Sequence, residues 1–196
     1  MRTETGLMLP PQNAGNVLLP LARAAIAREL GQAHSATAEA TWLREPGACF
    51  ITLTHDAKLR GCIGTLRAHR PLADDVRANA VAAAFRDPRF KPLSASEFAA
   101  VEVELSLLSP LEPMSFTGEL DALAQLRIGE DGVVFEYGYH SSTFLPQVWK
   151  DLRKPAEFMA HLKHKAGLPP DFWDSEVKLM RYTVTKWRES DFRNRA

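Results

Sequence analysis

The sequence predicts an α+β fold in which helices flank a mostly antiparallel sheet. Residues 48–66, "ACFITLTHDAKLRGCIGTL", contain two apolar extended segments on either side of a short turn, which is typical of an antiparallel hairpin. Further helices and strands follow without the strict strand–helix alternation of a parallel sheet. The chain also lacks a glycine-rich phosphate loop, which disfavours a kinase, a P-loop NTPase and a dinucleotide-binding domain.

Two amphipathic helices are predicted on either side of this hairpin. Apolar side chains recur at helical spacing over residues 16–30, and Gly31 ends the helix. The second helix lies within residues 70–87, "RPLADDVRANAVAAAFRD", where Asp74 and Asp75 suit the positive end of the helix dipole. The many alanines of this helix would let it pack closely against a sheet.

The rest of the chain predicts further strands and shorter helices. Ser94 and Glu97 have the spacing of a capping box, and alternating apolar and polar residues over 101–109 predict a half-buried strand. The remaining predicted elements are a helix over 120–126, a strand after the turn at 131–132, an extended segment ending at Pro146, a helix from Pro155 to Gly167, and a final strand over 177–187.

Composition predicts an ordinary globular protein of the cytoplasm. The 196 residues are 45% hydrophobic and 24% charged, and the 24 Lys and Arg residues balance the 24 Asp and Glu residues. A net charge of zero gives no general attraction for nucleic acid or for an acidic membrane. No segment approaches the ~18 apolar residues of a membrane span.

The two cysteines, Cys49 and Cys62, are predicted to be free thiols. They show no zinc-site spacing, and no third cysteine is present for an iron–sulfur cluster. A two-residue hairpin turn would place the two cysteines on one face about 7–8 Å apart, and a three-residue turn would place them on opposite faces. Neither geometry favours a disulfide. Apolar neighbours surround Cys49, so we expect it in the core.

The stretch "KLRGCIGTL", residues 58–66, raises the possibility of a reactive thiol at Cys62. In an extended strand, Arg60, Cys62, Gly64 and Leu66 would share one face, so a guanidinium would lie beside the sulfur and favour the thiolate. The flanking glycines would leave the thiol uncovered. The alternative carries equal weight on this stretch alone: Cys62 is a small core residue, and the glycines mark a bulge against which a helix packs.

The stretch "AFRDPRF", residues 84–90, follows the alanine-rich helix. Because Asp87 precedes a proline it must be extended, which can turn Arg86 and Arg89 toward one anion-binding spot. The sequence favours a simpler interpretation, an ion pair that fixes a loop. In either case the helix can return this stretch to the hairpin, so we expect it to lie close to Cys62.

Other candidate sites are weaker. His161 and His164 are one helical turn apart, but Lys163 and Lys165 crowd them with positive charge, which disfavours a metal. No GxSxG motif is present, which disfavours a serine hydrolase. We expect no cofactor and no metal.

Five motifs in a fixed order make the sequence similar to a known family. They are "LRGCIGTL" at 59–66, "AFRDPRF" at 84–90, "IGEDGVVF" at 128–135, "FLPQVW" at 144–149 and "KAGLPPDFW" at 165–173. Together they resemble the AMME chromosomal region protein family, whose bacterial and archaeal members are called AmmeMemoRadiSam system protein A. The resemblance extends from about Leu18 to Trp187.

The resemblance implies one domain over residues 14–190, with tails at 1–13 and 191–196. It implies a larger lobe built on an antiparallel sheet, a smaller lobe, and a cleft between them near Cys62. It also implies two partner proteins, a Memo-like protein and a radical SAM protein. The site residues expected from the residues and the resemblance together are Cys62, Arg60 and Asp87 as catalytic groups, and Arg86, Arg89, Gln147, Gly61 and Gly64 as substrate-binding groups.

Three functions are compatible with these residues. The chain could modify or deliver a substrate within a multi-protein system, with Cys62 as nucleophile or covalent carrier. It could instead be a non-catalytic regulatory module whose cleft binds a protein segment or nucleic acid. In the third interpretation the cysteine motif is purely architectural.

Overall fold

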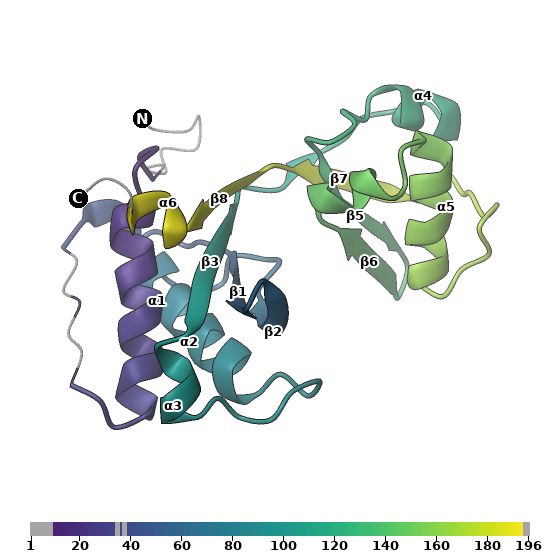
Figure 1. The fold of residues 1–196 in the computed structure, drawn as a ribbon. Coiled ribbons are helices and arrows are strands. Elements are labelled where there is room, and N and C mark those ends of the chain that lie inside the picture. Colours follow the sequence, from purple (N-terminus) through teal and green to yellow (C-terminus); the bar gives the residue numbers. More distant parts are fainter. Residues whose placement is uncertain (1–9, 34–35, 37–38, 194–196) are drawn as a thin grey trace. The chain divides into compact units, whose positions relative to one another are not determined.

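Each of the two units of the chain contains one four-stranded sheet flanked by helices (Figure 1). The computed structural model describes residues 10–33, 36 and 39–193. The first unit comprises Met1–Leu108 and Thr185–Ala196, and the second comprises Ser109–Val184. The predicted α+β fold is therefore confirmed, while the predicted cleft stays a prediction. Of the predicted tails, residues 1–9 and 194–196 lie outside the described residues.

The sheet of the first unit has the strand order β2-β1-β3-β8. Its strands are β1 (Cys49–His55), β2 (Lys58–Gly64), β3 (Val101–Leu108) and β8 (Val184–Arg188). Strand β1 pairs antiparallel with both β2 and β3. Burial alternates along β1, with Cys49, Ile51 and Leu53 buried, as expected for a sheet with one covered face.

The β1–β2 hairpin contains a two-residue turn and a β-bulge. Asp56 and Ala57 form the turn with φ angles of 50° and 59°, the conformation that matches the right-handed twist of paired strands. Leu53 pairs with Gly61 while Thr54 pairs with Leu59, so Arg60 is an extra residue without a partner in the register. The predicted hairpin is confirmed, but the bulge was not foreseen.

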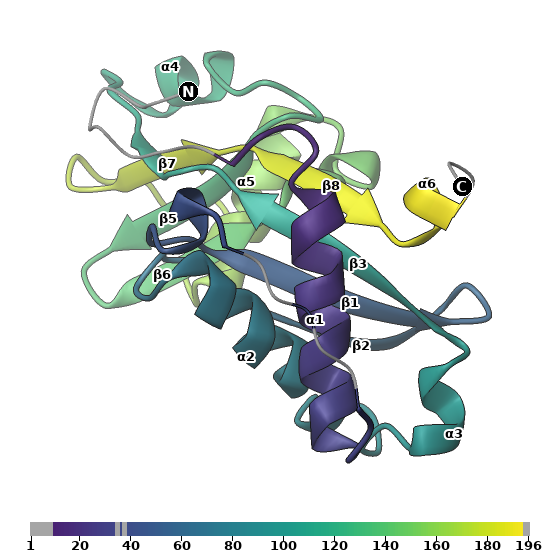
Figure 2. The same ribbon diagram turned by 90° about the vertical axis from the view of Figure 1, so that its left-hand side faces the viewer.

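Two long helices cover one face of this sheet, and Figure 2 shows α1 (Gly15–Glu29) and α2 (Leu72–Phe85) side by side on it. Their apolar side chains and those of the buried face of β1 form a single core. The shorter helices are η1 (Thr41–Leu43), α3 (Ala95–Phe98) and α6 (Ser190–Arg193). The predicted capping box is present at α3, between Ser94 and Glu97.

The second unit has its own core beneath a sheet of order β4-β7-β5-β6. Three of the five sequence motifs lie here and form structural contacts. Trp149 stacks on Phe158 with ring centroids 3.9 Å apart, and its indole N–H donates to the carbonyl of Asp131 at 2.7 Å. The elements are β4 (Glu112–Pro113), α4 (Glu119–Ala124), β5 (Gly132–Tyr137), β6 (His140–Phe144), η2 (Pro146–Lys150), α5 (Pro155–Lys165) and β7 (Lys178–Tyr182).

The final predicted strand, residues 177–187, is wrong as one element. It is divided into β7 and β8, which belong to different sheets. Local apolar alternation continues across Thr183, so the sequence pattern contains no sign of the change of sheet. None of the described helices has the length and apolar character needed to cross a membrane.

Candidate functional site

The close packing of α2 on β2 explains why residue 61 is a glycine. A Cβ atom at this position would lie 2.1 Å from the carbonyl oxygen of Ala83 in α2, closer than any side chain can approach a backbone atom. Gly61 is itself buried, and alanines on the facing side of α2 permit this approach. The glycine is therefore needed for packing and does not open a path to the thiol.

Gly64 likewise leaves no open space beside Cys62. It pairs directly with Phe50 across the hairpin, and a Cβ atom on it would lie 2.2 Å from the Phe50 ring. Of the two interpretations of the flanking glycines, these contacts favour close packing, because α2 and an aromatic ring occupy the space that the glycines leave.

Asp87 and Arg89 contact the backbone of Cys62 from the outer edge of the sheet. The N–H of Cys62 donates to Oδ2 of Asp87 at 2.8 Å, and its carbonyl accepts from Nη2 of Arg89 at 3.2 Å. Because β2 is an edge strand, these two side chains satisfy backbone groups that a further strand would otherwise pair. The prediction that "AFRDPRF" lies close to Cys62 is confirmed.

Asp87 and Arg89 also form a two-pronged ion pair with each other. Nε of Arg89 donates to Oδ1 of Asp87 at 2.9 Å, and Nη2 donates to Oδ2 at 2.6 Å. Asp87 is 4% exposed. The Arg89 guanidinium, supported by the Cys62 amide, holds the pKa of the Asp87 carboxyl well below its usual range, although burial opposes the shift. Asp87 in turn raises the pKa of Arg89.

Cys62 is half-buried, and its sulfur accepts a hydrogen bond from the facing strand. The Thr52 hydroxyl, which lies directly opposite on β1, donates to Sγ at 3.3 Å. Thr52 is on the half-buried face of β1, whereas Cys49 is on the face covered by α1 and α2. The bulge at residue 60 therefore sets the two thiols on opposite faces even though the turn has two residues. Both are free, as predicted.

Arg60 does not take the predicted place beside the thiol. Its Nε donates to Oε1 of Glu97 at 3.0 Å, and its Nη2 donates to the carbonyl of Lys91 at 2.9 Å. The Arg60 guanidinium and the Ser94 backbone and hydroxyl groups lower the pKa of Glu97 to about 2. The strand alternation assumed for residues 59–66 fails at the bulge, and Arg89 is the guanidinium that contacts Cys62.

Two other residues predicted to bind a substrate are Arg86 and Gln147. Arg86 is exposed and lines a groove between α1 and α2 together with Arg28 and Arg77. Arg89 pairs instead with Asp87, which supports the favoured interpretation of this stretch, an ion pair that fixes a loop. Gln147 lies in η2 of the second unit and is exposed. A role for Gln147 stays a prediction.

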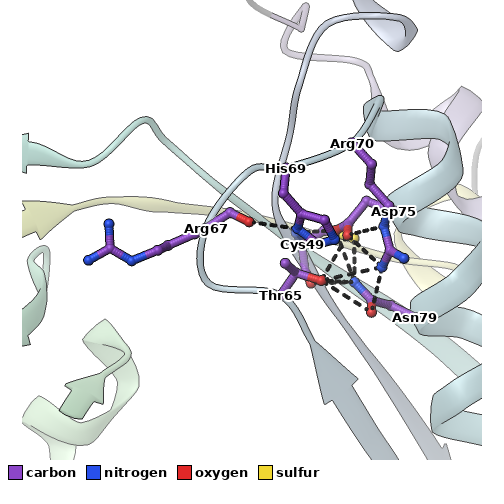
Figure 3. A network of polar contacts seen from close by, with 7 residues as sticks. All are labelled: Cys49, Thr65, Arg67, His69, Arg70, Asp75 and Asn79. Carbon is purple, nitrogen blue, oxygen red and sulfur yellow. Dashed lines mark hydrogen bonds and ion pairs between the residues drawn. The ribbon is translucent and has the colours of Figure 1, made fainter. Parts of the chain in front are cut away.

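A second cluster surrounds Cys49, and the sequence did not reveal it. Asp75 is fully buried and accepts hydrogen bonds from the Cys49 amide at 2.9 Å, from the Thr65 hydroxyl at 2.8 Å and from Nε of Arg70 at 2.8 Å. The Asn79 amide donates to the Cys49 carbonyl at 3.0 Å. Figure 3 shows these side chains converging between the hairpin and α2. Burial, and after it the charge of Asp75, raises the pKa of the Cys49 thiol, as expected for a core cysteine.

The two clusters share one design. In each, a buried aspartate at one end of α2 accepts the backbone N–H of a cysteine and pairs with an arginine: Asp75 with Cys49 and Arg70, Asp87 with Cys62 and Arg89. The Cys49 cluster did leave a signal in the sequence: two polar residues, Asp75 and Asn79, lie one turn apart on the apolar face of α2.

No metal site is evident in the described part of the chain. Among residues 10–33, 36 and 39–193, no group of three or more His, Cys, Asp or Glu side chains is arranged to hold a metal ion. His161 and His164 are both exposed on α5.

Comparison with known proteins finds relatives along most of the chain. The AMMECR1 family model matches residues 19–187. The protein MJ0810 of Methanocaldococcus jannaschii is 40% identical over 149 residues, which are 74% of each chain. A protein of Sulfurisphaera tokodaii is 35% identical over 191 residues, 91% of this chain and 83% of that protein. The crystal structure of the uncharacterized protein PH0010 from Pyrococcus horikoshii matches with a TM-score of 0.76 at 32% identity, covering 90% of this chain and 92% of that one.

Proposed function

The chain belongs to the AMMECR1 family, and from this premise we propose that it is one component of a three-protein modification system in which Cys62 is the reactive residue. The other two components are a Memo-like protein and a radical SAM protein. The system works in the cytoplasm, where both thiols stay reduced.

The observation that supports this proposal is the fixing of Cys62 at three atoms. Asp87 binds its amide, Arg89 binds its carbonyl, and Thr52 donates to its sulfur. A reactive group positioned by rigid neighbours loses little conformational freedom on meeting a substrate. Cys49, by contrast, is fully buried.

Each neighbour has a distinct part in the proposed site. Cys62 acts as nucleophile or as covalent carrier of the substrate. Thr52 stabilises negative charge on the sulfur through its hydroxyl proton. Asp87 acts on Cys62 only through the backbone and through Arg89, so it is a positioning residue. Arg60 fixes the chain between Lys91 and Glu97.

A genetic comparison tests the reactive role. Cells that contain the complete system would express the wild-type chain, Cys62→Ser, or Arg44→Ala as an exposed surface control, and their proteins and metabolites would be compared with those of a deletion strain. We expect the Cys62→Ser strain to match the deletion strain and the Arg44→Ala strain to match wild type, with all three chains equally abundant. A Cys62→Ser strain indistinguishable from wild type would contradict the proposal and would support the interpretation that the cysteine motif is purely architectural.

Purification of the native protein tests the partners. From cells that contain both neighbours, the tagged chain should co-purify with the Memo-like protein, the radical SAM protein or both. The Cys62→Ser chain should retain them, because the proposed role of the thiol is chemical. Recovery of neither neighbour, at native abundance and after mild crosslinking, would contradict the three-protein proposal.

A further inference from the structure

We infer that the groove between α1 and α2 docks a short acidic amphipathic helix of a partner protein. The groove has a volume of 540 Å³ and lies in the first unit, and the residues that hydrogen-bond Cys62 are not part of its lining. The inference is therefore independent of the reactive role proposed for Cys62.

The floor of the groove is apolar, and most of its side chains are small. Leu21, Ala24 and Ala25 contribute from α1, and Ala78 and Val81 contribute from α2. Side chains of this size leave room for the apolar face of an incoming helix to approach closely, which is the usual way in which a groove between helices binds a helical peptide.

The rim of the groove is rich in arginine. Arg77 pairs with Asp74 at 3.1 Å, but neither Arg28 nor Arg86 has a hydrogen-bond or ion-pair partner for its guanidinium among the described residues. Figures 1 and 2 show α1 and α2 running in the same general direction, so Arg28 and Arg86, near the two C-terminal ends, lie toward the same end of the groove. Glu29 is the carboxylate on this part of the rim, and the charge left after pairing is positive.

The size and charge of the groove favour a helix with acidic residues. Arginine near a helix C-terminus is ordinary by itself, because the helix dipole favours it. Here the arginines border an apolar floor, so a ligand must combine apolar side chains with carboxylates. The groove follows residues 21–29 of α1 and 74–86 of α2, which is ~12–18 Å at 1.5 Å per residue, or two to three helical turns.

Site-specific crosslinking in cells tests this inference. The photoreactive residue p-benzoylphenylalanine would replace Ala78 in the groove or, as a control, the exposed Ala99 of the first unit. We expect an adduct only from position 78, and mapping of the crosslinked peptide should locate it on a partner segment with apolar residues three or four apart and with Asp or Glu on its other face. Arg28→Glu with Arg86→Glu should abolish the adduct, whereas the equal charge change Arg44→Glu with Lys58→Glu should not.

A binding measurement completes the test with a defined probe. A synthetic peptide of the mapped segment should bind the purified full chain, and the Arg28→Glu, Arg86→Glu variant should bind it at least about tenfold more weakly, or about 1.4 kcal/mol. Four outcomes would overturn the inference: no adduct above the Ala99 control, an adduct to this chain or to a second copy of it, a basic or purely apolar partner segment, or binding that is insensitive to the two arginines.

Discussion

At the scale of single residues, the two cysteines differ in what surrounds them. Cys49 lies in the core among Asp75 and Asn79, and the Thr52 hydroxyl donates to Cys62 on the opposite face of the sheet. Sequence reasoning placed Cys49 in the core correctly, because its neighbours in the strand are apolar. It assigned the wrong arginine to Cys62, because a one-residue bulge changes which side chains share a face.

Asp75 should contribute far more to stability than its neighbour Asp74. Removing the buried carboxylate by Asp75→Ala leaves the Cys49 amide without an acceptor and the Thr65 hydroxyl with only a longer bond, to Oδ1 of Asn79 at 3.4 Å. We expect a loss of about 3 kcal/mol in the free energy of unfolding. Asp74→Ala removes an exposed pair with Arg77 and should cost about 0.5 kcal/mol or less. Urea denaturation of both variants measures the difference, and equal losses would contradict a structural role for the Cys49 cluster.

The Asp87–Arg89 pair should make stability depend on acid pH. The pKa of Asp87 is lowered in the folded chain, so its contribution is complete above the unfolded pKa, near 4, and is lost as the pH falls toward the folded pKa. The difference in unfolding free energy between wild type and Asp87→Asn should be full at pH 7 and should shrink from about pH 4 to pH 2. A difference that is constant over this range would mean that the carboxylate charge contributes nothing.

At the scale of elements, α2 is fastened to the hairpin at both ends and packed against it between them. Asp75 and Asp87 bind the backbone of β1 and β2, and Gly61 allows α2 to approach β2. The helix, the hairpin and the capping box were all predictable, since each depends on local periodicity or local spacing. The bulge, and the division of the last predicted strand into β7 and β8, depend on long-range pairing that local patterns do not encode.

Gly61→Ala tests the close packing of α2 on β2 while leaving Cys62 itself unchanged. The added methyl group would meet the Ala83 carbonyl at 2.1 Å, so α2 or β2 must move, at a cost of about 3 kcal/mol. Gly118→Ala is the matched control, because its Cβ atom meets nothing within 4 Å and its φ of 172° is ordinary extended backbone. Denaturation midpoints test this, and a Gly61→Ala chain as stable as Gly118→Ala would show that the helix is not held closely against β2.

At the scale of the whole molecule, two units with separate cores divide the five motifs between them. The first two motifs meet at Cys62, and the other three lie in the second unit, where a hydrogen bond from Trp149 to Asp131 joins two of them. The family was evident from the order of these motifs, and the match over residues 19–187 confirms it. The part that each residue has in the fold could not be predicted, because contacts between distant segments determine it.

The central claim is that Cys62 is the functional thiol. Its most direct test is the rate at which iodoacetamide alkylates each cysteine of the folded chain. In this reaction the sulfur forms a bond to carbon, iodide leaves, and the thiol proton passes to the buffer. We predict that peptide mass spectrometry at pH 7 will find Cys62 alkylated at least about tenfold faster than Cys49. The substitution Thr52→Val should lower the rate of alkylation of Cys62. Cys49 should react only when urea unfolds the chain. Equal, slow alkylation of both thiols in the folded chain, rising together on unfolding, would contradict the account and identify Cys62 as a structural residue.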